Sequence, residues 1–127
     1  MRSYDVAVAS LVLEAPIKWT DNLLSQNRIR DVVSQRRGIA RRIGYPALIR
    51  MALIRQLHIR LGMGVADGVR IAADLLDSAS AGVYQSGQLT LTIDVKELER
   101  SVDQRLIEVL ESAPSPRRGR PPRRSTS

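Results

Sequence analysis

Residues 8–24 read VASLVLEAPIKWTDNLL, and this stretch decides how the first third of the chain folds. The apolar run from Val6 to Leu13 predicts a short helix. Glu14-Ala15-Pro16 ends it, because proline suits the first turn of a following helix. From Ile17 to Gln26 apolar and polar residues fall on opposite faces at helical spacing. Two short helices joined by a tight turn predict a helix-turn-helix unit.

The polar face of this second helix carries the candidate base-reading side chains. Asparagine pairs with adenine, lysine with guanine, and an aspartate accepts from cytosine. The alternative is an ordinary solvated helix face. Trp19 lies at the edge of the apolar face, where we expect core packing more than DNA contact, although we keep it among the candidates. The other candidates on this helix are Lys18, Asp21, Asn22 and Ser25.

Arginine is concentrated in two blocks of the chain. Of 127 residues, 20 are Lys or Arg and 13 are Asp or Glu. Residues 28–42 hold six Arg and one acid, and residues 113–127 hold five Arg and no acid. The body between and around these blocks is close to neutral. Such blocks are typical of proteins that bind polyanions, and the guanidinium fork grips phosphate and the guanine edge with two hydrogen bonds.

Residues 32–43 predict a two-stranded wing. Val32-Val33 and Ile39 to Ile43 flank Arg36-Arg37-Gly38, where glycine supplies the positive φ of a short turn. A hairpin made only for solubility would intersperse both signs of charge, and this one does not. We therefore expect the wing arginines to contact DNA, with a tyrosine and an arginine at the start of the next helix binding phosphate. These candidates are Arg36, Arg37, Arg41, Arg42, Tyr45 and Arg50.

The remaining elements follow from hydrophobic periodicity. Residues 46–61 are apolar around almost the whole helix circumference, which is typical of a buried central helix, and residues 65–76 predict another helix. LTLTI at 89–93 alternates as a strand, to which Val83 and Tyr84 could pair across Ser86-Gly87. Asp94, with Glu97 three residues on, caps a last helix with one apolar stripe, which packs on the domain body or on a second copy. We divide the chain into a DNA-binding domain (1–77), a dimerisation or packing unit (83–111) and a disordered basic tail (112–127).

Two stretches carry a resemblance to a known family. VASLVLEAPIKWTDNLL (8–24) and VVSQRRGIARRIGYPALIRMALIRQLHIRLGM (32–63) resemble the MerR-type winged helix-turn-helix regulators and the related excisionase-like DNA-binding domains, over about residues 4–76. The resemblance implies a winged helix-turn-helix fold and DNA binding. The long dimer-forming coiled coil and effector domain of larger members have no counterpart, so we do not expect a small-molecule effector.

The tail carries a second resemblance. Arg118-Gly119-Arg120-Pro121 is similar to the AT-hook, which implies insertion of Arg118 and Arg120 into narrow A·T minor grooves. A generic basic tail is the alternative.

Several classes of function lack the residues they need. With no Cys and a single His, His58, the chain can form neither disulfides, Cys/His zinc sites nor a Ser/His/Asp or Cys/His catalytic set of the usual kind. Aromatic residues are 3% of the chain, too few for a platform that stacks single-stranded bases. No stretch reaches the length of a membrane span. We expect no cofactor, no metal, no enzymatic activity and a cytoplasmic, nucleoid location.

The sequence therefore predicts a mostly α fold with a small β wing: a winged helix-turn-helix, a short strand or hairpin and a C-terminal helix. We expect a homodimer that binds double-stranded DNA at specific sequences and regulates transcription. One alternative is a nucleoid-associated or recombination-accessory protein that coats or bends DNA. The other is a protein-interaction module, such as an antitoxin or a polymerase adaptor.

Overall fold

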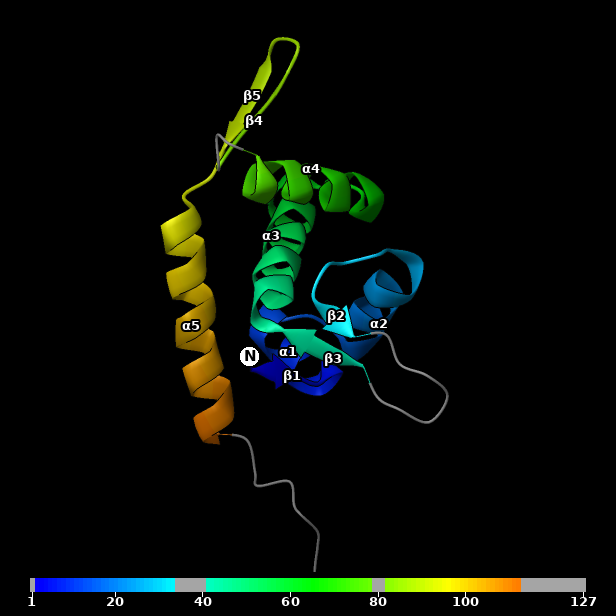
Figure 1. The fold of residues 1–127 in the computed structure, drawn as a ribbon, viewed down its shortest axis with the longest axis vertical. Helices are drawn as coiled ribbons and strands as arrows, with labels where there is room; N and C mark the ends of the chain where they lie inside the picture. Colours follow the sequence, from blue (N-terminus) through cyan, green and yellow to red (C-terminus); the bar gives the residue numbers. More distant parts are fainter. Residues whose placement is uncertain (1, 34–40, 79–81, 113–127) are drawn as a thin grey trace, which may run out of the picture.

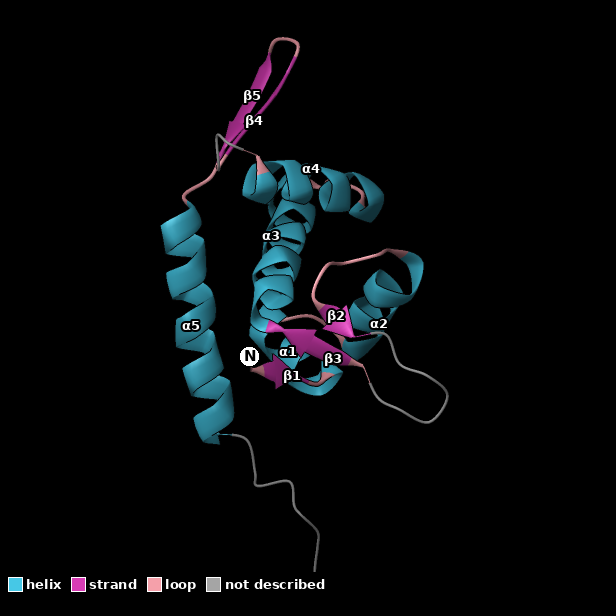
Figure 2. Cartoon of the chain, viewed as in Figure 1, coloured by secondary structure: helices cyan, strands magenta, loops and turns pink. Residues whose placement is uncertain are grey.

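The computed structural model describes residues 2–33, 41–78 and 82–112, and this part of the chain is mostly helical with small antiparallel sheets (Figures 1 and 2). Five helices lie within the described residues: α1 (Val6–Leu13), α2 (Ile17–Gln26), α3 (Tyr45–Leu61), α4 (Val65–Asp77) and α5 (Val95–Ser112). Their bounds agree with the predicted helices to within one residue or two. None of these helices combines the length and the apolar character needed to cross a membrane.

Capping residues set where α1 begins and ends and where α2 begins. The carboxylate of Asp5 accepts a hydrogen bond from the backbone N–H of Val8 at 2.8 Å, which satisfies a free donor at the start of α1. Glu14 ends α1 in the left-handed conformation, with φ of 53°, and its N–H bonds back to Leu11. Pro16 then takes an extended conformation directly before α2. The turn between the two helices is therefore as tight as the sequence predicts.

A three-stranded antiparallel sheet lies beside this helix pair. β3 (Arg42–Gly44) is its central strand, flanked by β1 (Ser3–Tyr4) and β2 (Val32–Val33). Ser3 pairs with Gly44 and Val32 with Ile43. The sequence predicted the pairing of β2 with β3, and β1 is an addition. The predicted turn residues Arg36-Arg37-Gly38 and the strand residue Ile39 lie outside the described residues.

The long helix α3 is the centre of the core, as its apolar circumference predicts. Eight of its side chains are buried: Ala47, Leu48, Ile49, Met51, Ala52, Leu53, Ile54 and Leu57. Gly62, with φ of 66°, ends the helix in the left-handed conformation that glycine adopts without strain. The helix α4 then packs across α3, with Ile71, Ala72 and Leu75 buried.

Beyond α4 the chain forms a hairpin of β4 (Val83–Ser86) and β5 (Leu89–Thr92). This hairpin projects past α4, on the far side of that helix from α2 and the three-stranded sheet (Figure 1). Val83 and Tyr84 pair with the LTLTI strand as predicted, but the turn lies at Gly87-Gln88, because Ser86 still belongs to β4 and pairs with Leu89.

The last helix, α5, packs on α1 and α3 along the whole domain body (Figure 1). Val102 and Leu106 are buried there, and Leu98 and Val109 pack against the same core. Asp94 caps α5 by accepting from the N–H of Glu97 at 3.0 Å, as predicted. Of the two partners considered for the apolar stripe, the structure therefore shows the domain body, and the stripe is not open to a second copy.

Candidate nucleic-acid interface

A buried hydrogen bond fixes how α2 crosses α1. The Ser10 hydroxyl donates to Oγ1 of Thr20 at 2.8 Å, and both residues are buried. Buried hydroxyls are costly unless they are paired, so this contact favours one relative placement of the two helices. Leu23, only 2% exposed, anchors the same face of α2 in the core. The opposite face of α2 is thereby held toward solvent.

The predicted base-reading residues all lie on that exposed face. Lys18, Asp21, Asn22 and Ser25 are exposed. Neither the Lys18 ammonium nor the Asn22 side-chain amide has a partner among the described residues. The Ser25 hydroxyl donates to the carbonyl of Asn22 at 3.3 Å, within its own helix. The free polar groups of this face are therefore those of Lys18 and Asn22.

Trp19 belongs to the packed side of α2. Its ring is half-buried, the guanidinium of Arg55 lies 4.8 Å from its centroid, and the ring of His58 lies 5.9 Å away. A cation over an indole face is a favourable contact. His58 in turn makes a 2.9 Å hydrogen bond through Nδ1 to the carbonyl of Met63, which gives it the structural role expected. These contacts place Trp19 in the packing between α2 and α3, as expected, and a contact of Trp19 with DNA stays a prediction.

Arg41 connects the β2–β3 hairpin to α2. Its Nη1 lies 3.4 Å from Oδ1 of Asp21, and the Arg41 side chain is only 18% exposed. Arg41 directly precedes β3 and follows residues 34–40, which the structure does not describe. The ion pair thus places the base of the hairpin against the exposed face of α2, and it also engages the carboxylate that was expected to read cytosine.

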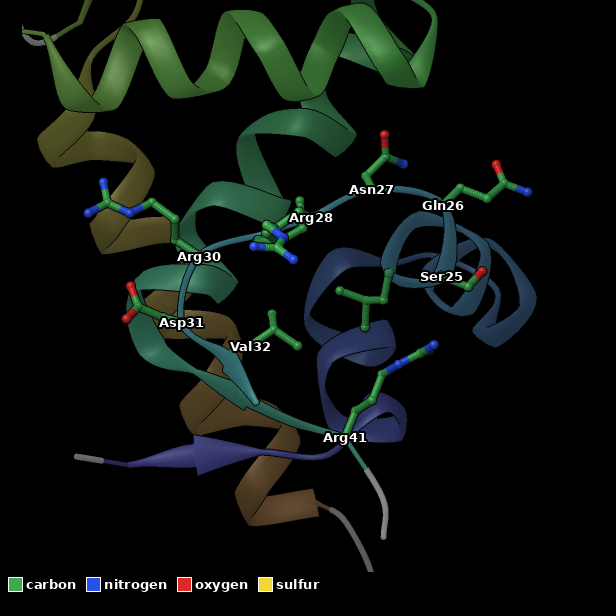
Figure 3. Close-up of a pocket in the computed structure, with 10 residues that line it drawn as sticks. Ser25, Gln26, Asn27, Arg28, Arg30, Asp31, Val32 and Arg41 are labelled. Carbon is green, nitrogen blue, oxygen red and sulfur yellow. The ribbon is translucent and has the colours of Figure 1, made fainter. Parts of the chain in front are cut away.

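A hollow of about 770 Å³ separates the end of α2 from β2 (Figure 3). Its rim carries Arg28 and Arg30 from the loop after α2 and Arg41 from the other side, as Figure 3 shows. Arg28 is exposed and has no ion-pair partner among the described residues, whereas Arg30 lies 3.5 Å from Asp77. Asp31 is the one acid in the lining. Of the three arginines that line this hollow, Arg28 is the one without an acidic partner among the described residues, and its guanidinium is suited to an anionic ligand.

The side chain of Arg42, on β3, is directed toward the neighbouring strand β1. Its Nε donates to the Ser3 hydroxyl at 3.1 Å and its Nη2 to the Ser3 carbonyl at 2.8 Å. The side chain is exposed but serves to hold β1 to β3. Its positive charge remains close to the hairpin.

Tyr45 and Arg50 are correctly placed at the start of α3, but both have intramolecular partners. The Tyr45 hydroxyl donates to Oδ1 of Asp103 on α5 at 2.5 Å, and burial together with this contact raises the pKa of Tyr45 above its usual range. Arg50 makes a double hydrogen bond to Asp77, whose pKa is lowered mainly by that contact. Both side chains are thus engaged within the chain, and binding of phosphate by either of them stays a prediction.

Four predicted residues fall outside the described part of the chain. Arg36 and Arg37 belong to residues 34–40, and Arg118 and Arg120 belong to residues 113–127. Their roles stay predictions.

The end of α2 and the loop after it contribute residues that the sequence did not single out. Arg28 and Arg30 entered only as part of the basic block, and Gln26 and Asn27 were not considered, yet all four line the hollow (Figure 3). The signal was available: a polar and basic run, QNRIR, directly follows a candidate recognition helix.

Comparisons with protein-family models, with curated proteins and with solved structures each find no match to this chain. In the described ranges, no group of three or more His, Asp or Glu side chains is placed to hold a metal ion. The candidate interface is the surface formed by α2, the loop that follows it and Arg41 at the start of β3.

Proposed function

We propose that this protein binds double-stranded DNA through a winged helix-turn-helix and regulates transcription. One observation carries the proposal: the exposed face of α2 carries Lys18 and Asn22, and Ser25 of the same face lines the hollow bordered by Arg28 and Arg41. Groups that can read base edges thus lie next to groups that can bind phosphate. In protein–DNA interfaces the phosphate contacts position the protein and the base contacts recognise the sequence.

The dimensions of DNA suit this surface. The major groove is about 12 Å wide and admits one α-helix, so α2 would lie in it with Lys18 and Asn22 toward the base edges. Arg28 and Arg41, which flank the end of α2, would then meet the phosphates at the border of the groove. The hairpin that continues from Arg41 carries Arg36 and Arg37 in sequence and would act as the wing.

The order of elements supports the same proposal. A tight helix pair, a β-hairpin, a buried helix and a second helix packed on it follow one another as the resemblance to MerR-type and excisionase-like domains implies. The core helix α3 and the Ser10–Thr20 contact hold α2 rigidly, and a rigid element positions base-reading groups better than a loop.

The test is a selection of binding sites from random duplexes, followed by measurement of affinity for the selected and scrambled sequences over a range of salt. We expect a preference of at least about a thousandfold for the best site and an affinity that falls steeply with salt. Equal affinity for every sequence would favour a DNA-coating or DNA-bending role instead. Absence of binding at low salt would overturn the proposal.

The tail is tested in the same assay with a chain that ends at Ser112, after the last described helix. Loss of the five tail arginines lowers affinity by removing charge. If Arg118 and Arg120 enter the minor groove, the loss is greater on A·T-rich than on G·C-rich duplexes of equal length. An equal loss on both would indicate a generic basic tail.

A further inference from the structure

The β4–β5 hairpin has an open edge, although such edges are usually protected. In the described residues its sheet consists of two strands, so each strand has one side without a backbone partner. Its ten residues, VYQSGQLTLT at 83–92, include no charged residue and no proline, in a chain that is 26% charged. Charges and prolines are the usual means of preventing edge-to-edge pairing, and this hairpin uses neither.

The hairpin is held firmly at its base. The Gly82 N–H donates to the Leu75 carbonyl on α4 at 2.7 Å, and the Ile93 N–H donates to the Gly82 carbonyl at 2.8 Å. Gly82 has φ of 89°, and a Cβ there would lie 2.9 Å from the Ile93 carbonyl oxygen, so only glycine fits. The Tyr84 hydroxyl accepts a bond from Arg70 at 3.2 Å. Since isolated two-stranded hairpins are marginally stable, these contacts keep the edge in a fixed position.

The hydrogen-bond pattern identifies which groups the outer edge presents. Gly82 and Ile93 are a hydrogen-bonded pair, so the pairs two and four residues along, Tyr84–Leu91 and Ser86–Leu89, are bonded as well. The intervening residues direct their N–H and C=O groups outward, and on β5 these are Thr90 and Thr92. It is β4 that packs on α4, which leaves β5 as the outer edge.

We propose that two copies of this chain associate by antiparallel pairing of their β5 edges into a four-stranded sheet, with Thr90 of each copy opposite Thr92 of the other. Strands of identical sequence pair in this way about a two-fold axis, so one contact satisfies both copies. The reciprocal bonds join the outward groups of Thr90 and Thr92. The strand order in the dimer is β4–β5–β5–β4.

Side chains fit this register as well as the backbone does. Leu89, Leu91 and Ile93 share one face of the strand, and Leu89 is 75% exposed in the single chain. Pairing Thr90 with Thr92 sets Leu91 of one copy opposite Leu91 of the other, and Leu89 opposite Ile93. Both pairs occupy non-hydrogen-bonded positions, where cross-strand side chains lie closer together and an apolar pair stabilises the sheet most.

Charge also favours a second copy at this edge over a contact elsewhere. Each chain carries a formal net charge of +7, so two copies repel one another wherever basic residues meet. The hairpin is uncharged and projects past α4, away from α2 and the three-stranded sheet (Figure 1). The apolar stripe of α5 is already buried against α1 and α3.

The test is the molar mass of the full chain in solution without DNA, measured by sedimentation or light scattering up to high micromolar concentration. We expect twice the 14.1 kDa of one chain. Thr90→Pro removes an outward N–H and no bond of the hairpin itself, so the mass should fall by half. Gln85→Pro is the matched control: it removes the outward N–H of the facing residue on β4 and should leave the dimer intact.

A second pair of variants keeps every backbone N–H. It distinguishes loss of strand pairing between two copies from misfolding of the single chain. Thr90→Glu with Thr92→Glu brings like charges together across the interface and should give a single chain. Thr90→Glu with Thr92→Lys brings opposite charges together in the same register and should restore the dimer. A wild-type chain that stays at 14.1 kDa at all concentrations would overturn the proposal, and so would equal masses for these two double variants.

Discussion

Arg50 and Asp77 form a two-pronged ion pair between the central helix α3 and the end of α4. Nη1 of Arg50 donates to Oδ2 at 3.0 Å and Nη2 to Oδ1 at 2.7 Å. Arg30, from the loop after α2, lies 3.5 Å from the same carboxylate. One acid therefore joins the core helix, the helix behind it and the loop that borders the proposed DNA surface.

Asp77→Asn should lower the free energy of unfolding by about 1–2 kcal/mol at neutral pH, because Arg50 loses its charged partner while its side chain is only 11% exposed. Urea denaturation measures the change. Asp74→Asn is the control, since Asp74 is exposed on the same helix and has no ion-pair partner among the described residues. If both variants lose the same free energy of unfolding, the effect belongs to the charge of α4 as a whole and not to the Arg50–Asp77 ion pair.

The same pair makes stability depend on pH. The hydrogen bonds from Arg50 lower the pKa of Asp77 in the folded state. A lowered folded pKa contributes stability that is complete above the unfolded value, about 3.9, and is lost as the pH falls through the folded value. The free energy of unfolding of the wild type should therefore exceed that of Asp77→Asn by a constant amount above about pH 5. This difference should become smaller as the pH falls below that value. A margin that grows on acidification would contradict the assignment.

Arg28→Ala combined with Arg41→Ala should flatten the salt dependence of DNA binding. Each phosphate contact contributes about 0.9 to the slope of log K against log salt, so the slope should become shallower by up to about 1.8. Lys96→Ala combined with Arg100→Ala is the control, because it also removes two positive charges, here from exposed positions on α5. If the slope changes equally in control and test variants, net charge and not contact explains the effect.

Asn22→Ala should reduce discrimination between the best site and scrambled DNA by about 1–3 kcal/mol and leave nonspecific affinity nearly unchanged. The side chain is exposed on α2 and carries no charge, so its contribution lies in base contacts. Competition between the two duplexes measures the difference. Equal losses on both would remove Asn22 from base reading.

Leu106→Ala should lower the free energy of unfolding by about 2–5 kcal/mol, because the side chain is 4% exposed and its removal leaves a cavity against the core. Ile107→Ala is the control, because Ile107 is the next residue, has the same side-chain volume and is 57% exposed. It should lower the free energy of unfolding far less. Thermal or urea unfolding compares them. Comparable losses would mean that α5 does not pack on α1 and α3 through this stripe.

Much of the fold could be predicted because its signals are local. The break at Glu14 to Pro16, the all-round apolar helix before Gly62 and the cap at Asp94 each act within a few residues. What the sequence missed depends on distant partners. β1 has two residues and forms only because Gly44 and Ile43, some forty positions away, offer an edge. The stripe on α5 was visible, but whether Val102 faces its own core or another chain depends on tertiary packing.

The candidate site was predicted in outline for the same reason. The exposed face of α2 follows from helical periodicity, so Lys18 and Asn22 could be placed from sequence. Arg50 looked like a phosphate ligand because arginine near a basic hairpin is a plausible one. Only the three-dimensional packing of α4 brings Asp77 within 2.7 Å of it. Charge alone cannot distinguish an arginine that has an internal partner from one that awaits a ligand.

The packing of α5 on α1 has a consequence for how the chain is made. A ribosome adds about 5–20 residues per second and delivers α1 to α4 before the helix that covers them. Until Val102 and Leu106 emerge, the apolar surface that they cover on α1 and α3 stays open to water and to other nascent chains. The contacts of α1 with Val102 and Leu106 therefore form only after α5 has been synthesised.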